Sequence, residues 1–274
     1  MTITVLTENT PHPQNKNLQS AHGLALAIQT KKTSLLYDVG PSGTLQNNAS
    51  ELKIPLDSIE AAILSHGHDD HAGDLEHFGL INKCATIYMG KGATAERWSI
   101  KSGSPRSIGI PSLHKTVSTR MVTVFEDLKA PNFTILTAAP GQQSRPAGNQ
   151  TLLMGAQGNR MPDEFLDELT LVLEGEQGLV VLTGCSHRGI LNIIDQVQSY
   201  FSSKKVSMVV GGFHLRDGED HPEKMQHIAQ ELAQKLPLAQ IYGGHCTGEE
   251  GKKALHQAFR NRFTPLHVGQ VIET

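Results

Sequence analysis

The sequence predicts an α/β fold in which two β-sheets pack face to face and helices cover their outer faces. Two observations support this prediction. Short segments rich in β-branched and aliphatic residues recur along the 274 residues, bounded by turn residues. Segments with apolar residues at helical spacing lie between them in both halves of the chain. Strands and helices that recur in each half are typical of two packed sheets with helices outside.

The first third of the chain is predicted to be mainly strands. Four are expected within residues 3–9, 23–30, 33–40 and 61–68. Between the last two, Leu45, Ala49 and Leu52 recur at helical spacing, so residues 42–60 are predicted to be a helix that leads into a strand. Residues 73–90 are predicted to form a short helix followed by a strand.

Residues 91–150 differ from the rest in being polar and rich in Gly and Pro. Strand-like pieces are scattered through it, for example at residues 121–127 and 133–139. We expect this segment to be an insertion or lid that shapes a pocket, rather than a second domain. The chain, residues 1–274, is therefore predicted to be a single domain.

The second half repeats the alternation of strands and helices. A hairpin is expected over residues 168–187, and Ile190, Ile194 and Val197 lie on one face of an amphipathic helix predicted over residues 188–201. The remaining elements are expected as a strand over 206–214, a helix over 221–236, a strand over 239–248, a helix over 249–259 and a final strand over 263–273.

The overall composition excludes several classes of function. A formal net charge of −3 provides no basic surface for nucleic acid. No secretion signal is recognised at the N-terminus, and no apolar run approaches the roughly 20 residues of a membrane span. Three widely spaced cysteines, Cys84, Cys185 and Cys246, favour a reducing cytoplasm over a disulfide scaffold. The expected partner is a small-molecule substrate, with no nucleic acid and no membrane, and assembly into a homo-oligomer is left open.

Histidines stand where four apolar segments stop, in "AAILSHGHDDH", "VVLTGCSH", "SMVVGGFH" and "QIYGGHC". Each segment has one or two glycines near the break, which permit a sharp turn and a close approach of the backbone. Strands that end on one edge of a sheet bring their terminal residues together, and such loops commonly carry chemistry. We therefore expect the following histidines to converge: His66, His68, His71, His187, His214 and His245.

The segment "SHGHDDH" predicts a metal site, because a solvated loop gains nothing from so many ligand-type residues. His66 and His68 are two residues apart, so on extended backbone they face the same side and can bind one ion. Asp70 and His71 lie where a turn begins and can reach a second ion. We expect two divalent metal ions, with zinc first and manganese or iron as alternatives. Such a pair of metals holds a hydroxide between them in hydrolytic enzymes.

The same segment matches the His-x-His-x-Asp-His signature of the metallo-β-lactamase superfamily, which the chain resembles in further motifs. Asp38 in "LYDVG" resembles the aspartate that supports the metal histidines from behind, and His245 in "GGHC" resembles the last metal histidine. Cys185 in "LTGCSH" stands where the family usually has a bridging aspartate, so it is a candidate ligand. The resemblance implies the αββα sandwich of this family.

One family residue is missing. The resemblance places a third-motif histidine just before the strand "ELTLVL", where this chain reads "MPDEFLDELTL". We favour His187, two residues past Cys185, as the substitute. An oxygen ligand from Glu164, Asp167 or Glu168 is the alternative.

The pattern from "HGLALAI" to "YGGHCTG" is similar, over nearly the full chain, to one subgroup of the family. This subgroup is that of 7,8-dihydropterin-6-methyl-4-(β-D-ribofuranosyl)aminobenzene-5′-phosphate synthase, which implies pterin- and phosphate-bearing substrates. His22 and His214 match family positions outside the metal motifs, so they are candidates for substrate contact or for supporting the ligands. The helix start beside Arg188 is a candidate anion site, with a solvated arginine as the alternative.

The function implied by the resemblance is that of a metal-dependent hydrolase or a related transferase. A metal-bound hydroxide would attack a small substrate, and Asp70 would orient the hydroxide and hold the second metal. Two alternatives stand beside this interpretation. One is a phosphodiesterase that acts on nucleotides, and the other is a non-catalytic module that binds a metal or a ligand.

Overall fold

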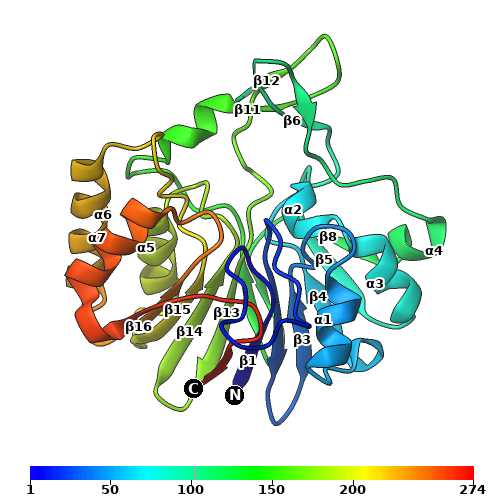
Figure 1. The fold of residues 1–274 in the computed structure, drawn as a ribbon, viewed down its shortest axis with the longest axis horizontal. Coiled ribbons are helices and arrows are strands. Elements are labelled where there is room, and N and C mark those ends of the chain that lie inside the picture. The colour runs from blue at the N-terminus through cyan, green and yellow to red at the C-terminus, as the bar shows by residue number, and fades with distance from the viewer. Residues whose placement is uncertain (102) are drawn as a thin grey trace.

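The computed structural model describes residues 1–101 and 103–274. Two seven-stranded sheets pack against each other, and helices cover the outer face of each (Figure 1). The αββα sandwich predicted from the sequence is confirmed. Both chain termini lie at the same end of the sandwich, opposite the end where the small loop-borne sheet projects (Figure 1).

The first sheet is built mostly from the N-terminal half of the chain. In spatial order it contains β18 (Val271–Glu273), β1 (Thr2–Thr7), β2 (Ala25–Gln29), β3 (Ser34–Tyr37), β4 (Ala61–Ile63), β5 (Thr86–Gly90) and β8 (Met121–Val124). Strands β18 to β3 pair antiparallel, whereas β3, β4, β5 and β8 run parallel. The parallel strands β3 and β4 therefore end at the same edge.

The second sheet is built from the C-terminal half. In spatial order it contains β17 (Phe263–Pro265), β16 (Gln240–Gly243), β15 (Val206–Gly211), β14 (Gly178–Thr183), β13 (Thr170–Gly175), β10 (Thr134–Leu136) and β9 (Leu128–Lys129). Strands β14, β15, β16 and β17 are parallel, so their carboxyl ends also meet at one edge.

Helices form the two outer layers. Helices α1 (Leu45–Glu51), α2 (Asp69–Ala72), α3 (Leu75–Ile81) and α4 (Lys115–Ser118) belong to the first half, and α5 (Ile190–Tyr200), α6 (Pro222–Lys235) and α7 (Glu249–Phe259) to the second. Short 3₁₀ turns cover Leu56–Ser58, Ala147–Thr151 and Arg260–Arg262. Among the described residues, no helix combines the length and apolarity needed to cross a membrane.

Successive apolar side chains along a strand point to opposite faces of the sheet and so belong to different layers of the core. Leu35 and Tyr37 pack between the two sheets, whereas Leu36 between them packs under α1 and α3. This period of two is expected for a strand that is covered on both faces. In the second half, Ile190, Ile194 and Val197 are buried against the second sheet, as their helical spacing predicted.

Most predicted elements occur where the sequence placed them, but the final strand does not. The prediction of one strand over residues 263–273 is wrong, because β17 joins the second sheet and β18 joins the first. Gly269, with φ of 76°, allows the turn that separates them. The chain end thus crosses from one sheet to the other and extends both.

Residues 91–150, expected to be an insertion or lid, are divided between two parts of the structure. Strands β8, β9 and β10 extend the two main sheets. The remainder contributes to a small four-stranded sheet with the order β12 (Met161–Pro162), β11 (Leu152–Met154), β6 (Arg97–Ser99) and β7 (Arg106–Ser107). This small sheet stands above the strand ends of the sandwich (Figure 1).

A fully buried arginine anchors the small sheet to the sandwich. Arg97 on β6 lies 2.9 Å from Asp163 and 2.7 Å from Asp167, and all three side chains are at most 1% exposed. Asp167 also accepts a hydrogen bond of 2.8 Å from the backbone N–H of Gly67. The loop that carries His66 and His68 is therefore tied to the small sheet through one carboxylate.

Removing this arginine should destabilise the protein strongly. Arg97→Met would leave two buried carboxylates without their counter-charge, which typically costs about 3–5 kcal/mol. The matched control is Arg145→Met, which removes an exposed ion pair with Glu164 and should cost about 0–1 kcal/mol. Denaturant unfolding of both variants measures the difference. Equal losses in the two would contradict the anchoring role of Arg97.

Candidate metal centre and pocket

The carboxyl ends of strands from both sheets meet at one edge of the sandwich and carry the clustered histidines. His66, His68 and His71 follow β4 in the first sheet, whereas His187, His214 and His245 follow β14, β15 and β16 in the second. The centroid of the His66 ring lies 4.3 Å from that of His71 and 4.9 Å from that of His187. The structure thus brings together histidines that lie up to 179 positions apart in the sequence.

Three imidazoles form what we call the first donor group: His66, His68 and His187. Their candidate ligand atoms all lie within 4.8 Å of one another, and all three residues are buried. Nε2 of His66 lies 3.0 Å from Nδ1 of His68. Nε2 of His187 is buried and has no hydrogen-bond partner among the described residues. The ring of Phe165 stacks on His187 at 3.9 Å and holds its plane.

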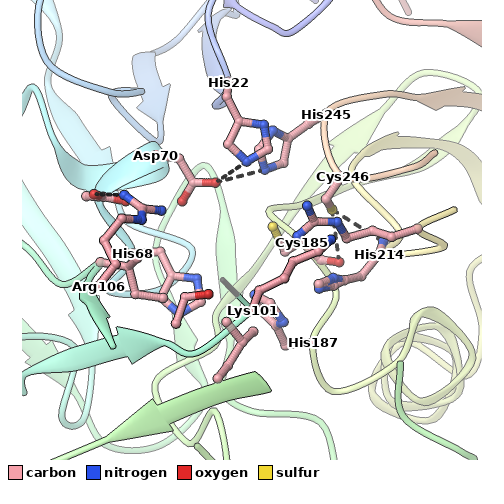
Figure 2. Close-up of a pocket in the computed structure, with 15 residues that line it drawn as sticks. His22, His68, Asp70, Lys101, Arg106, Cys185, His187, His214, His245 and Cys246 are labelled. Atoms are coloured by element: carbon pink, nitrogen blue, oxygen red, sulfur yellow. Dashed lines mark hydrogen bonds and ion pairs between the residues drawn. The ribbon is translucent and has the colours of Figure 1, made fainter. Parts of the chain in front are cut away.

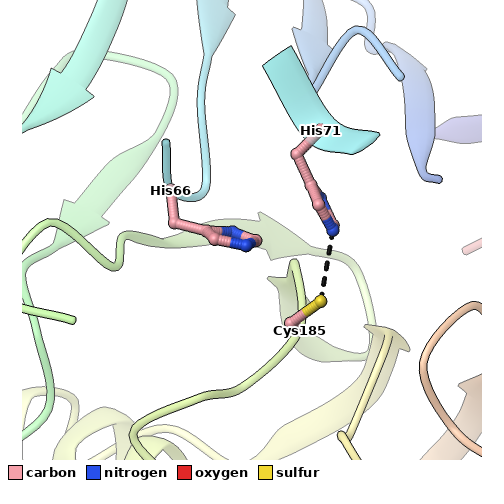
Figure 3. Close-up of side chains that lie close together, drawn as sticks. All are labelled: His66, His71 and Cys185. Atoms are coloured by element: carbon pink, nitrogen blue, oxygen red, sulfur yellow. Dashed lines mark hydrogen bonds between the residues drawn. The ribbon is translucent and has the colours of Figure 1, made fainter. Parts of the chain in front are cut away.

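A second donor group contains Asp70, His71, Cys185 and His245. Nε2 of His71 lies 3.0 Å from Nε2 of His245 and 3.2 Å from Sγ of Cys185. Oδ2 of Asp70 lies 3.4 Å from Nε2 of His245 and 4.0 Å from Nε2 of His71. His66 connects the two groups, since it points at the same space as His71 and Cys185 (Figure 3).

Asp38 orients one imidazole in each donor group. Its buried carboxylate accepts a hydrogen bond of 2.7 Å from Nδ1 of His71 and another of 2.7 Å from the hydroxyl of Ser65. The Ser65 oxygen in turn lies 2.9 Å from Nδ1 of His66, from which it can accept. Because each Nδ1 is taken, Nε2 of both rings faces the common space.

Two asparagines orient His187 and His245 in the same way, through a contact at Nδ1. Oδ1 of Asn149 lies 2.8 Å from Nδ1 of His187, and its amide donates to the His187 carbonyl at 2.8 Å. Oδ1 of Asn9 lies 3.1 Å from Nδ1 of His245. The rings with a polar partner at Nδ1 are therefore those of His66, His71, His187 and His245. In each of them Nε2 is the atom left to bind a metal ion.

The histidines of the donor groups differ in pKa. Burial lowers the pKa of His68 to about 3 and holds the pKa of His66 and His187 well below the usual range, so these rings are neutral. Burial opposes the charge of His71 as well, but the carboxylates of Asp38 and Asp70 outweigh it and raise its pKa to about 9. Neutral imidazoles beside a carboxylate are a donor set that suits zinc.

Asp70 remains ionised despite its burial. Desolvation would raise its pKa, but the neighbouring His71 and His245 hold it well below the usual range. Burial raises the pKa of the Cys185 thiol well above its ordinary value. A bound cation would reverse this effect, because thiolate is the form that binds metal.

A pocket of about 370 Å³ opens beside the donor groups. Its wall includes the expected residues His22 and His214, as well as Lys101 and Arg106 from the small sheet (Figure 2). His214 is 2% exposed, packs 4.5 Å from the ring of His187, and both of its ring nitrogens lack partners among the described residues. Oδ2 of Asp70 lies 3.4 Å from Nε2 of the more exposed His22.

The three acids considered as substitutes for the missing histidine are engaged elsewhere. Glu164 pairs with Arg145 on the surface, and Asp167 pairs with buried Arg97. The Glu168 carboxylate accepts from the backbone N–H groups of residues 187 and 188. Of the four candidates, only His187 lies in a donor group.

The expected anion site at Arg188 does not form. Arg188 is 7% exposed, and its guanidinium donates to the backbone carbonyls of Ala139 and Glu164 at 2.8 and 3.0 Å. The neighbouring Ser186 hydroxyl donates to the Gly212 carbonyl at 2.7 Å. Both side chains therefore brace the loop after β14 rather than face a ligand.

Several residues at this edge adopt an uncommon backbone conformation. Asp38, Ser186, His214 and His245 have φ between 47° and 60°, in the left-handed region that non-glycine residues seldom occupy. All four lie within three residues of the end of a strand that stops at the cluster. Such conformations cost of order 1–3 kcal/mol each and concentrate at functional sites, where surrounding contacts maintain them.

Most of the residues that position the cluster carry no local signal in the sequence. Asn149 lies in a Gly- and Pro-rich stretch that carries no recognisable signal, and Arg97 and Phe165 are ordinary residues locally. Asn9 is the exception, because Glu8 and Asn9 are polar residues that follow directly after the buried strand β1, a pattern that indicates a functional strand end. Glu8 is buried and accepts from the backbone N–H of His245.

Comparison with known proteins agrees with this geometry. Residues 21–192 match the family described as the metallo-beta-lactamase superfamily. A 7,8-dihydropterin-6-methyl-4-(beta-D-ribofuranosyl)-aminobenzene-5′-phosphate synthase from Methanocaldococcus jannaschii is 28% identical over 278 residues, which cover 94% of this chain and 92% of the relative.

Solved structures share the whole architecture. Tm1679, a metal-dependent hydrolase of the beta-lactamase superfamily, aligns with a TM-score of 0.83 and 29% identity, over 100% of this chain and 99% of that one. YhfI from Bacillus subtilis, a metallo-beta-lactamase fold protein, aligns with a TM-score of 0.60 and 15% identity over 100% and 98% of the two chains. The second likeness shows a shared fold.

Proposed function

Since the chain belongs to the metallo-beta-lactamase superfamily, we propose that it is a metal-dependent enzyme that hydrolyses a small substrate or transfers a group from it. The observation that carries this proposal is the pair of donor groups beside one pocket. The first offers three neutral imidazoles, and the second offers two imidazoles, a carboxylate and a thiol.

The side chains fit two divalent cations. His66, His68 and His187 would hold one ion, and Asp70, His71, Cys185 and His245 would hold the other. The buried Nε2 atom of His187 without a partner supports this assignment, because a buried polar atom normally finds one. Imidazole, carboxylate and thiolate together suit zinc best, with manganese or iron as alternatives.

The metals would supply Lewis acidity and an activated water, as they do in other two-metal hydrolases. Among the protein groups, Asp70 is ionised and faces the pocket, so it can orient the attacking water. His214 presents ring nitrogens without partners to the same pocket and can contact the substrate. His22, beside Asp70, can assist in holding that carboxylate in position.

The substrate is proposed to be small and to carry a phosphate or a pterin. The pocket volume of about 370 Å³ lies in the range typical of small-molecule sites. The relative whose name combines a dihydropterin with a ribofuranosyl-aminobenzene-5′-phosphate supports the same class of substrate, and its designation as a synthase is the reason that group transfer stands beside hydrolysis in this proposal. His187 beside His66 and His68 supports an intact site over a degenerate, non-catalytic module.

The first donor group can be tested through metal content. His187→Ala should lower the bound metal from two ions per chain towards one, because the first group would retain only two imidazoles. His214→Ala is the matched control, since His214 is an equally buried neighbour outside both groups and should leave the metal content unchanged. Elemental analysis of the purified variants measures this. Unchanged metal in His187→Ala would assign the first ion to other ligands.

The proposed reaction can be tested at Asp70. Asp70→Ala should remain folded but lose about 10²–10⁴-fold in turnover, which is typical for a group that positions or deprotonates the attacking water. Hydrolysis of p-nitrophenyl phosphate, bis(p-nitrophenyl) phosphate and p-nitrophenyl acetate measures it, with exposed Asp57→Ala as the control. Near-normal turnover with a lowered melting temperature would reduce Asp70 to a structural residue.

A further inference from the structure

The outer part of the pocket carries three cationic side chains from three different segments. Lys101 follows β6, Arg106 lies on β7, and Arg216 follows β15 two residues after His214. Figure 2 shows Lys101 and Arg106 on the small-sheet side and His214 on the opposite side of the pocket. The same wall also carries Asp69 and Asp70, so the cations lie beside carboxylates that hold them in place.

Glu219 organises two of these cations. Its Oε1 atom lies 2.6 Å from Nζ of Lys101 and 3.7 Å from Nε of Arg216, and the Glu219 side chain is 12% exposed. One carboxylate therefore draws together a lysine from the small sheet and an arginine from the second half of the sandwich. The pair retains a net positive charge and unused N–H donors, because one carboxylate neutralises only one of two cations.

Arg106 is held less tightly. Nη1 lies 3.6 Å from Oδ2 of Asp69, and the arginine side chain is 67% exposed. It can therefore turn towards a ligand without breaking a buried contact. The wall of the pocket continues inward from Arg216 to His214, whose two ring nitrogens lack partners among the described residues. Polar groups thus line the pocket from its mouth to the donor groups.

We propose that Lys101, Arg106 and Arg216 form a subsite for a non-reacting phosphate monoester group of the substrate. The proposal rests on the proposed function, because the reacting bond would then lie further in, beside the two donor groups. A phosphate dianion has three terminal oxygens and can accept from three separate cations at once. A carboxylate has two oxygens, one acceptor atom fewer than there are cationic side chains. Arginine adds a planar fork of donors that suits phosphate oxygens.

Calorimetric titration with phenylphosphonate tests the subsite without turnover, because its carbon–phosphorus bond resists hydrolysis. The metal-loaded wild type should bind it, and the double variant Lys101→Ala/Arg216→Ala should bind it at least tenfold more weakly with unchanged metal content. The matched control is Lys31→Ala/Lys32→Ala, which removes two lysines remote from the pocket and should bind as the wild type does.

Failure of the phosphate subsite and failure of the proposed hydrolysis give different results in these titrations. Equal binding by wild type and the Lys101/Arg216 variant would overturn the subsite and would leave the metals as the phosphonate ligand. Benzoate bound as tightly as phenylphosphonate, with the same sensitivity to the variant, would overturn the phosphate assignment in favour of a carboxylate. A third result is that the protein hydrolyses none of the test esters and still binds phenylphosphonate more tightly than the Lys101/Arg216 variant does. That result would retain the subsite and reject hydrolysis.

Discussion

The buried carboxylate of Asp38 is the contact on which the candidate metal centre most depends. It accepts from the backbone N–H and hydroxyl of Ser65 and from Nδ1 of His71, at 2.6, 2.7 and 2.7 Å. Through Ser65 it also sets the orientation of His66. A single anion at the end of β3 therefore aims one imidazole of each donor group. Gly184 allows this arrangement, because a Cβ there would lie 2.1 Å from the Ser65 hydroxyl oxygen.

The site exists only where the two halves of the sandwich meet. The first sheet supplies His66, His68 and Asp70, and the second supplies His187 and His245, so neither half holds a complete set. The apolar layer between the sheets fixes their separation, and the Tyr37 hydroxyl donates across it to the Leu169 carbonyl at 2.8 Å. The 3₁₀ turn before β11 adds Asn149, which braces His187, and β6 of the small sheet adds Arg97, which braces the His66 loop through Asp167. Stability of the fold and geometry of the site thus share the same contacts.

The sequence predicts those features that neighbouring residues determine, and it does not predict those that depend on contacts between distant segments. The cluster around His66, the strand-end histidines and the helix over residues 190–200 are encoded in short windows, and all occur where expected. The sequence favours His187 over three acids, and in the structure it lies beside His66 and His68. Asn149 and Arg97 act through contacts with residues far away in the sequence, so no local pattern marks them. The split of residues 263–273 between two sheets depends likewise on which edge each piece reaches.

Anomalous diffraction from crystals of the zinc-loaded protein, recorded at the zinc edge, would locate the metal ions. We expect two peaks about 3.5–4 Å apart, as in two-metal hydrolytic sites. One peak should lie against Nε2 of His66 and His187, and the other against Nε2 of His71 and His245. A peak only at surface residues, or none within reach of these four nitrogens at full zinc loading, would contradict the proposed metal centre.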